Sequence, residues 1–315
     1  MARIFGTDGV RGVANTELTP ELALKLGRAG AYVLAQHLAP GQPVNILVGK
    51  DTRLSGDLLA NALTAGILSV GADVYTVGVL PTPAVAWLTK NQAMTAGVMI
   101  SASHNPAADN GIKFFAHNGC KLPDELEEEI EHYLEHTEEL PRPAGDKVGR
   151  LHQVTSWPEL YIDFLCKLVQ VPLSGLRVVI DCANGAVSHI AQRLFERLGV
   201  QVDVLNANPN GLNINVACGS THPQGLATRV QQIGADLGLA FDGDADRLIA
   251  VDHQGKIVDG DAIMAICALA MQRAGRLRNN TLVATVMSNL GLEQAMKAAG
   301  IKLLRAPVGD RYVLA

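Results

Sequence analysis

Short apolar runs alternate with amphipathic stretches along this 315-residue chain. The apolar run over residues 45–49 is typical of a buried strand, and a polar loop and a helical pattern over 55–70 follow it. Gly71 then marks the end of that helix, and residues 72–77 alternate as a strand does. Strand, loop, helix, glycine and strand in this order predict a βαβ unit with parallel strands.

The same order of elements recurs twice, and each time a glycine ends the helix. Strands, helices and closing strands are predicted over residues 176–181, 186–198 and 200–205, and again over 281–286, 290–299 and 301–304. Three copies predict an α/β fold of repeated βαβ domains, with mixed, mostly parallel sheets and an active-site cleft between the domains. The alternative is one large doubly wound sheet.

Composition indicates where these domains end. An acidic helix over residues 126–140 is followed by a proline and glycine cluster at 141–145, and its carboxylates are expected to form a solvated face. A connecting helix over 161–169 leads into the second domain, and a turn at 253–256 precedes the third. We therefore predict domains over residues 1–155, 156–254 and 255–315.

Charge and composition exclude several classes of protein. A hydrophobic fraction of 48% with 18% charged residues indicates a globular chain rather than a disordered one. A net charge of -5 without a basic block argues against nucleic acid as a partner. The apolar runs are too interrupted to span a bilayer, and the five dispersed cysteines favour reduced thiols. We expect a soluble cytoplasmic protein with no membrane partner.

A polar turn, Ser101-Ala102-Ser103-His104-Asn105-Pro106, directly follows an apolar run. It therefore lies at the carboxyl end of a predicted strand, where open α/β sheets bind ligands. Ser101 and Ser103 are both candidate nucleophiles. Ser103 is favoured because His104 and Asn105 provide polar partners for phosphate oxygens. The alternative is an ordinary turn rich in serine, asparagine and proline.

A second loop, Asp242-Gly243-Asp244-Ala245-Asp246-Arg247, follows the buried strand predicted over 237–241. Its three alternating carboxylates offer the oxygen ligands that Mg²⁺ prefers, and a phosphate oxygen would complete the ligand shell. The two loops together predict a centre made of a phosphoserine and a metal ion. The alternative is an acidic β-turn with exposed carboxylates, and we expect the loop to face the solvent.

Basic residues accompany these loops. The glycine-rich opening over residues 6–12 contains Arg11, whose guanidinium is suited to bidentate phosphate contact. Lys113 follows the serine loop and is placed to activate its hydroxyl or to bind the transferring group. Residues 50–53 are interpreted as structural pairing at the edge of the cleft. The alternative for each lysine or arginine is an ordinary surface charge.

The serine and aspartate motifs resemble those of the α-D-phosphohexomutase superfamily. The segments over residues 6–12 and 307–313 are similar to those of its bacterial phosphoglucosamine mutase branch. The resemblance implies that Ser103 is phosphorylated and that it holds Mg²⁺ together with Asp242, Asp244 and Asp246. The same match implies phosphate-binding residues, namely Arg11, His104, Asn105, Lys113 and Arg247.

The resemblance implies the interconversion of glucosamine 6-phosphate and glucosamine 1-phosphate, which leads to UDP-N-acetylglucosamine and peptidoglycan precursors. The phosphoserine would donate its phosphoryl group, and a 1,6-bisphosphate would form and turn around in the cleft. Glucosamine or glucose 1,6-bisphosphate is the implied activating donor. The implied partners are small sugar phosphates and, in a homodimer, a second copy of the chain. The alternatives are a phosphomannomutase or phosphoglucomutase, and an inactive phosphoprotein that retains the metal centre.

Members of this superfamily have four domains. The resemblance implies that a sugar-binding loop and a fourth domain, which docks the non-reacting phosphate, lie beyond the residues of this chain. We therefore expect residues 1–315 alone to retain two folded domains and Mg²⁺ binding, with negligible mutase turnover.

Overall fold

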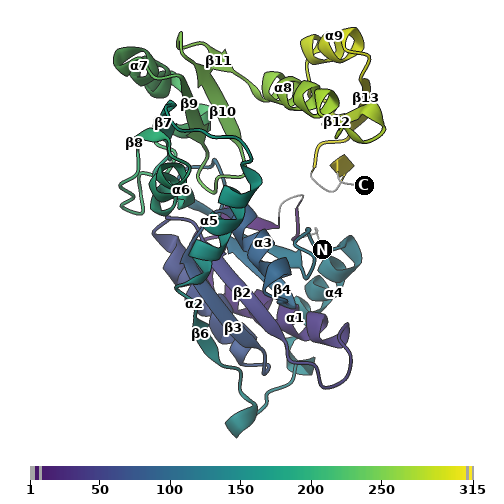
Figure 1. Ribbon diagram of the computed structural model, residues 1–315. Coiled ribbons are helices and arrows are strands. Elements are labelled where there is room, and N and C mark those ends of the chain that lie inside the picture. The colour runs from purple at the N-terminus through teal and green to yellow at the C-terminus, as the bar shows by residue number, and fades with distance from the viewer. Residues whose placement is uncertain (1–3, 7–8, 310–311, 314–315) are drawn as a thin grey trace.

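The computed structural model describes residues 4–6, 9–309 and 312–313. Parts of two motifs, residues 7–8 and 310–311, lie outside the described residues. Figure 1 shows three α/β units that follow one another along the chain. The strands of the described residues form separate sheets of six, five and two strands. This arrangement confirms repeated α/β domains and excludes one large doubly wound sheet.

The first unit contains a mixed sheet in the order β1-β5-β4-β2-β3-β6, in which β5 is antiparallel to both of its neighbours. The strands are β1 (Val10–Val13), β2 (Asn45–Lys50), β3 (Asp73–Val79), β4 (Ala96–Ile100), β5 (Asp109–Ala116) and β6 (Leu151–Gln153). The helices are α1 (Pro20–Gln36), α2 (Ser55–Leu68), α3 (Thr82–Asn91) and α4 (Asp124–Glu135), with short 3₁₀ turns η1 (Thr137–Glu139) and η2 (Gly145–Lys147).

The strands of the first sheet are apolar on both faces. In β2, Ile46 and Val48 pack into a core with residues of α1, α2 and α4, whereas Leu47 packs on the opposite face with α3. Successive strand residues point to opposite faces, so a continuous apolar run is what a sheet covered on both sides requires. The sheet is therefore the middle layer of an α/β/α sandwich.

The second unit has a five-stranded sheet in the order β11-β10-β9-β7-β8, with β10 antiparallel to β9 and β11. The strands are β7 (Arg177–Asp181), β8 (Gln201–Leu205), β9 (Leu237–Phe241), β10 (Leu248–Asp252) and β11 (Ile257–Val258). The helices are α5 (Trp157–Leu168), α6 (Ala191–Arg197) and α7 (Gln224–Ile233), with 3₁₀ turns η3 (Ala186–His189) and η4 (Gly219–Thr221).

One core joins the first two units. Leu88 of α3, Ile162 of α5 and Ile180 of β7 belong to the same buried cluster. The predicted connecting helix is therefore confirmed as α5, although it begins at Trp157 rather than at Tyr161. The shared core places the carboxyl ends of β4 and β9 near each other.

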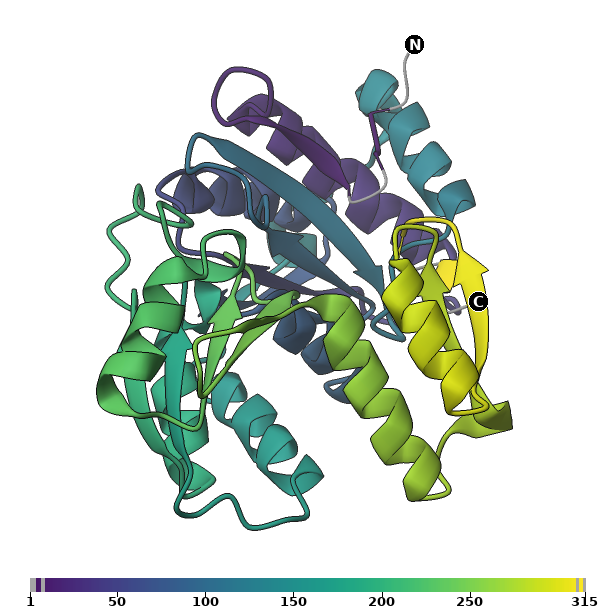
Figure 2. The same cartoon turned by 90° about the horizontal axis from the view of Figure 1, so that it is seen from above.

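The third unit consists of the parallel pair β12 (Thr281–Thr285) and β13 (Lys302–Ala306), with α8 (Gly260–Arg273), α9 (Leu290–Ala298) and the turn η5 (Arg278–Asn280). Both helices begin at a side-chain cap, because Asp259 accepts from Ala262 N at 2.9 Å and Asn289 accepts from Leu292 N at 3.0 Å. Figure 1 and Figure 2 both show this unit to one side of the second unit, to which α8 joins it.

The acidic helix differs from its prediction in two ways. It ends at Glu135, and the rest of the predicted stretch forms the short turn η1. Its carboxylates are not all solvated, because Glu127 is 1% exposed and pairs with Lys121 at 3.1 Å. A high density of acidic residues indicates an exposed face, but the sequence does not show which of them meet a partner from another segment.

No helix within the described ranges is both long enough and apolar enough to cross a bilayer.

Candidate active site

The serine loop begins where β4 ends. Ser101 N donates to Gly111 O of β5 at 2.9 Å, and the chain then leaves the sheet. Ser103 has a φ of +53°, a left-handed conformation that is uncommon for a residue with a side chain. Its N–H donates to Ser101 Oγ at 2.9 Å. The loop depends on such contacts to keep Ser103 in this conformation.

A buried arginine from the loop after β2 supplies further contacts. Arg53 Nη2 donates to Ser103 O at 3.0 Å and to Asn105 O at 2.9 Å. Its Nη1 donates to Asp109 O at 3.0 Å. These carbonyls face inward and need donors once the loop is buried. One guanidinium therefore holds the serine loop from inside.

Asp51 completes this support. Its carboxylate accepts from Arg53 Nε at 2.9 Å and from Ser101 Oγ at 2.6 Å. Burial raises the pKa of Asp51, while Arg53 and the hydrogen bond from Ser101 oppose that shift. The predicted structural pairing of residues 50–53 is confirmed for Asp51 and Arg53, and it serves the serine loop. The hydroxyl of Ser101, the other candidate nucleophile, donates its hydrogen to Asp51.

Two residues that the sequence analysis missed connect the loops across the units. Asn215 Nδ2 donates to Ser103 O at 2.9 Å and to Asn105 O at 3.1 Å. Thr82 Oγ1 donates to Asp244 Oδ2 at 2.5 Å, and Thr82 N donates to Asp244 O at 2.9 Å. Thr82 lies between two prolines shortly after a strand, which was a usable signal. Asn215 lies in an irregular loop with no such signal.

The hydroxyl of Ser103 meets the aspartate loop of the second unit. Ser103 Oγ donates to Asp242 Oδ2 at 2.7 Å. Arg247 Nη2 donates to the same Ser103 Oγ, and Arg247 Nε donates to Asp242 Oδ2 at 3.1 Å. The two motifs predicted to form one centre therefore lie in direct contact, although 139 positions separate Ser103 from Asp242.

The expectation that the aspartate loop faces the solvent is wrong. Asp242 is 1% exposed and Asp244 is 5% exposed, whereas Asp246 stays on the surface. Ser103 itself is 3% exposed. The serine loop packs over the aspartate loop and excludes water from it, which the acidic composition of the motif does not reveal.

The three carboxylates of the aspartate loop form a cluster of like charges that a cation would stabilise. One ligand oxygen from each of Asp242, Asp244 and Asp246 lies within 4.8 Å of the others. Burial and the two neighbouring carboxylates raise the pKa of Asp244 to about 8. Its Oδ1 is buried and has no hydrogen-bond partner among the described residues. A hard divalent cation would supply the missing partner and the missing charge, so these residues fit a Mg²⁺ ion.

His104 lies at the edge of this cluster. Arg247 Nη2 donates to His104 Nδ1. Burial and the positive charge of Arg247 lower the pKa of His104, and Arg11 contributes in the same direction. A nitrogen that accepts from arginine carries no proton, so the imidazole is neutral and its proton lies on Nε2. His104 is therefore a hydrogen-bond donor through Nε2.

The remaining predicted residues lie around the serine loop. Arg11 is on β1 and pairs in register with Gly111 of β5. Lys113 is on β5, with its Nζ 5.4 Å from the centre of the Phe115 ring. Asn105 donates through Nδ2 to Asp109 Oδ2 at 2.9 Å, which stiffens the loop itself.

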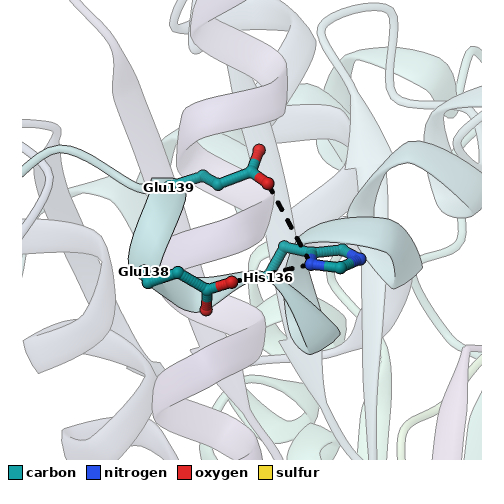
Figure 3. Close-up of side chains that lie close together, drawn as sticks. All are labelled: His136, Glu138 and Glu139. Carbon is teal, nitrogen blue, oxygen red and sulfur yellow. Dashed lines mark ion pairs between the residues drawn. The ribbon is translucent and has the colours of Figure 1, made fainter.

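A second cluster of side chains that could bind a metal ion is formed by His136, Glu138 and Glu139, at a different place in the sequence from these two loops. His136 Nδ1 is 3.6 Å from Glu138 Oε1 and 4.0 Å from Glu139 Oε1. Figure 3 shows both glutamates directed toward the imidazole. The three residues are consecutive or nearly so, and the side chain of Glu138 is 71% exposed. Water satisfies carboxylates at such a position, so nothing here requires a cation.

Three family profiles match the chain along most of its length. Residues 2–141, 159–255 and 259–315 match alpha/beta/alpha domains I, II and III of the phosphoglucomutase/phosphomannomutase family, respectively. A solved phosphoglucomutase/phosphomannomutase family protein from Burkholderia thailandensis superposes with a TM-score of 0.83 at 25% identity, covering 99% of this chain and 67% of the other.

A more distant structure shares the fold. It is an Aspergillus fumigatus N-acetylphosphoglucosamine mutase in complex with GlcNAc-6P and magnesium, with a TM-score of 0.53 at 18% identity. The match covers 94% of this chain and 67% of the Aspergillus chain. At this identity the likeness concerns the fold alone.

Two bacterial relatives are much more similar in sequence. The phosphoglucosamine mutase of Desulforamulus reducens is 56% identical over 315 residues, and that of Thermoanaerobacter sp. is 58% identical over 314 residues. Each alignment covers 100% of this chain and 70% of the relative. The chain belongs to the phosphoglucosamine mutase family, whose members are isomerases of the phosphohexomutase superfamily.

Proposed function

We propose that this protein interconverts glucosamine 6-phosphate and glucosamine 1-phosphate through a phosphoserine at Ser103. The observation that carries the proposal is the contact of Ser103 Oγ with Asp242 and Arg247. A serine that only shaped a turn would need no partners from a second domain. The identity to phosphoglucosamine mutases supports the amino sugar as the substrate.

The proposed reaction is a pair of phosphoryl transfers. The bond from phosphorus to Ser103 Oγ breaks while a bond from phosphorus to a sugar hydroxyl oxygen forms, which yields the 1,6-bisphosphate. The proton lost by the sugar hydroxyl balances the one gained by Ser103 Oγ, which then donates to Asp242. The bisphosphate then turns around and returns its other phosphate to the serine. Glucosamine or glucose 1,6-bisphosphate would phosphorylate a serine that has lost its phosphate. Positioning and charge stabilisation provide most of the catalysis in such transfers.

Asp242, Asp244, Asp246 and a phosphate oxygen on Ser103 are the proposed ligands of Mg²⁺. The buried Oδ1 of Asp244, which has no hydrogen-bond partner in the part of the chain that the structure describes, supports this assignment most directly. When bound, the ion neutralises charge on the transferring phosphoryl group. The magnesium in the Aspergillus fumigatus enzyme is compatible with the same choice of metal. Thr82 would keep Asp244 oriented through the hydrogen bond at 2.5 Å.

The phosphate-binding roles follow from the charges near Ser103. Arg247 already donates to the serine oxygen and would bind a phosphate oxygen in its place. His104 would donate through Nε2 as a neutral imidazole. Arg11 acts on His104 electrostatically, which supports its place beside the phosphate.

Lys113 and Asn105 are also proposed to bind the phosphoryl group or the sugar phosphate. Lys113 lies on β5, the strand that follows the serine loop, and its flexible side chain carries a positively charged ammonium group. Asn105 Nδ2 donates one of its two hydrogens to Asp109, and the second would be donated to a phosphate oxygen.

The proposed domain boundaries follow residues 155 and 254. Strand β6 ends at Gln153 and belongs to the first sheet, which supports the first boundary. The family matches to domains II and III meet near residues 255 and 259, which supports the second. A homodimer and a cytoplasmic location stay predictions.

The deciding experiment is an assay on glucosamine 6-phosphate, with mannose 6-phosphate and glucose 6-phosphate as competing substrates. It uses the intact protein, meaning a chain with all four domains expected of the superfamily, because residues 1–315 alone are expected to have negligible turnover. We expect the highest kcat/KM for the amino sugar. A preference for mannose or glucose phosphates would favour the other mutase activities. Mg²⁺ binding without turnover on any of the three would support the inactive phosphoprotein.

A further inference from the structure

Helix α4 holds the segment that leads into the Arg11 strand. Glu131 Oε1 accepts hydrogen bonds from Ile4 N and from Phe5 N, both at 2.7 Å. One carboxylate oxygen therefore binds two successive backbone N–H groups that have no place in a sheet ladder. Such charge-assisted bonds are stronger than neutral ones.

A second contact from the same region holds the next residue. Lys121 Nζ donates to Gly6 O at 3.4 Å and pairs with Glu127 of α4 at 3.1 Å. Both charged side chains are buried or nearly so, with 10% of the Lys121 side chain and 2% of the Glu127 side chain exposed. A buried pair keeps its geometry better than an exposed one because water does not compete for it.

Apolar packing fixes this segment as well. Phe5 is 2% exposed, and its ring centre lies 6.3 Å from that of Phe114 on β5. Gly6 N donates to Gly9 O at 3.0 Å, directly before β1. A Cβ on Gly9, which has a φ of +86°, would lie 2.4 Å from Ile112 O. The segment therefore enters β1 at one defined position against β5.

Strand β1 has little other support within the sheet. It is an edge strand of four residues, and among the described strands it pairs with β5 alone. Its Arg11 lies opposite Gly111, and a Cβ on Gly111 would lie 3.0 Å from Arg11 Cγ and 2.6 Å from Ser101 O. Arg11 is thus one strand away from the serine loop. Short edge strands fray unless their ends are held.

We propose that Glu131, supported by the Lys121–Glu127 pair, is a positioning residue for Arg11. It anchors residues 4–6 to α4 and thereby fixes the start of β1 and the guanidinium that faces the phosphoryl group. The role of Arg11 in phosphate binding rests on the proposed function. The acidic residues of α4 thus have two roles. Some, such as Glu128, face the solvent, whereas Glu127 and Glu131 hold the segment before β1 in place.

The test compares three variants of α4 in the intact protein. Glu131→Ala removes both hydrogen bonds, Glu131→Gln keeps an acceptor oxygen, and Glu128→Ala is the control at an exposed position of the same helix. We expect Glu131→Ala to lower kcat/KM about tenfold, with most of it regained by Glu131→Gln, because small misplacements of a binding group cost rate steeply. Glu128→Ala should equal the wild type.

Hydrogen exchange separates positioning from general stability. Amides of residues 9–13 should exchange at least about tenfold faster in Glu131→Ala, while those of β2 and β4 should be unchanged. Faster exchange throughout the first unit would overturn the proposal, because the residue would then only stabilise the fold. Unchanged exchange over residues 9–13 would overturn it as well.

A double-mutant cycle tests whether the effect runs through Arg11. In the Arg11→Ala background, Glu131→Ala should cause no further loss of kcat/KM, because coupled residues are not additive. Additive losses would overturn the proposal. Absence of mutase turnover in the wild type would overturn the proposed function instead. The hydrogen-exchange rates of residues 9–13 would then still show whether Glu131 anchors the start of β1.

Discussion

Two clusters among the described residues have the donor types of a metal site, and they differ in almost every other respect. Asp242, Asp244 and Asp246 lie at the end of β9, where a loop from another unit covers two of them. His136 and its two glutamates follow α4 within four positions and stay on the surface. Donor type and proximity therefore do not by themselves identify a cation site.

The two clusters differ in how unfavourable their charges and unpartnered oxygen atoms are when no cation is bound. In the buried cluster, Asp244 Oδ1 has no hydrogen-bond partner from the described ranges, and burial with the neighbouring carboxylates raises the pKa of Asp244 to about 8. In the exposed cluster, the glutamates reach both the imidazole and the solvent. A fold keeps an unfavourable arrangement of charges where a ligand or a reaction compensates for it. We therefore propose the buried cluster, and not the exposed one, as the functional site.

Ser103→Ala should have the largest effect, because it removes the group that links the buried cluster to the reaction. We expect turnover to fall by about 10³-fold or more and the acid-stable phosphate to be lost. Ser101→Ala is the matched control, with a smaller loss, because Ser101 supports the loop through Asp51. Phosphopeptide mapping that placed the phosphate on Ser101 would overturn the assignment.

Asp244→Asn should weaken Mg²⁺ binding by about 10- to 100-fold and lower turnover at subsaturating Mg²⁺. The variant keeps the shape of the side chain but removes a negative charge from the cluster. Isothermal titration with Mg²⁺ measures the affinity, and Glu138→Gln in the exposed cluster is the control. Equal Mg²⁺ affinity in the two variants would show that the aspartate loop is only a turn.

The pH dependence of stability should distinguish the two clusters in metal-free protein. Burial and the neighbouring carboxylates raise the pKa of Asp244 from its ordinary 3.8 to about 8, so between these values the folded state binds a proton that the unfolded chain does not. The contribution of Asp244 to stability is therefore lost as pH rises through this window. We expect Tm to fall from about pH 5 to about pH 8, with Mg²⁺ opposing the fall.

The matched variant for that experiment is Asp244→Asn, which cannot titrate. Its Tm in metal-free buffer should depend less on pH than that of the wild type over the same range. It should also be higher at the upper end of the range, because the repulsion with Asp242 and Asp246 is relieved. An identical pH profile in both proteins would contradict the assigned repulsion.

Glu138→Gln and Glu139→Gln should have the smallest effects. Exposed ion pairs contribute about 0–1 kcal/mol to the free energy of unfolding. We expect Mg²⁺ affinity and turnover to equal those of the wild type. A Mg²⁺ affinity lowered by either change would show that exposure does not exclude cation binding at this surface.

Local sequence patterns predicted much of the architecture. The order of elements in the three strand–helix–strand repeats was predicted correctly because the periodicity of apolar residues and the terminating glycines are local properties. The helix predicted over residues 186–198 was only partly correct, because it divides into the 3₁₀ turn η3 and the shorter helix α6. The serine and aspartate motifs were found for a similar reason, since each is a short run at the end of an apolar strand. Their resemblance to a known superfamily then connected them.

Other features depend on contacts between distant segments. Asn215 and Thr82 reach the two loops across 112 and 162 positions, and neither is part of a motif. The acidic helix was predicted correctly in type, but only the fold shows that Glu131 binds the backbone of residues 4–5. Hydrophobic periodicity carries no information about such pairs.

The sequence by itself determined which residues could do the chemistry, because hydroxyls, carboxylates and guanidiniums are properties of the residues. Only the tertiary structure decided which of them are buried together. Alternating aspartates in a turn normally face water, and Asp242 and Asp244 do not because the serine loop packs over them. Burial raises the energy of like charges, and that depends on how two separate loops meet in space.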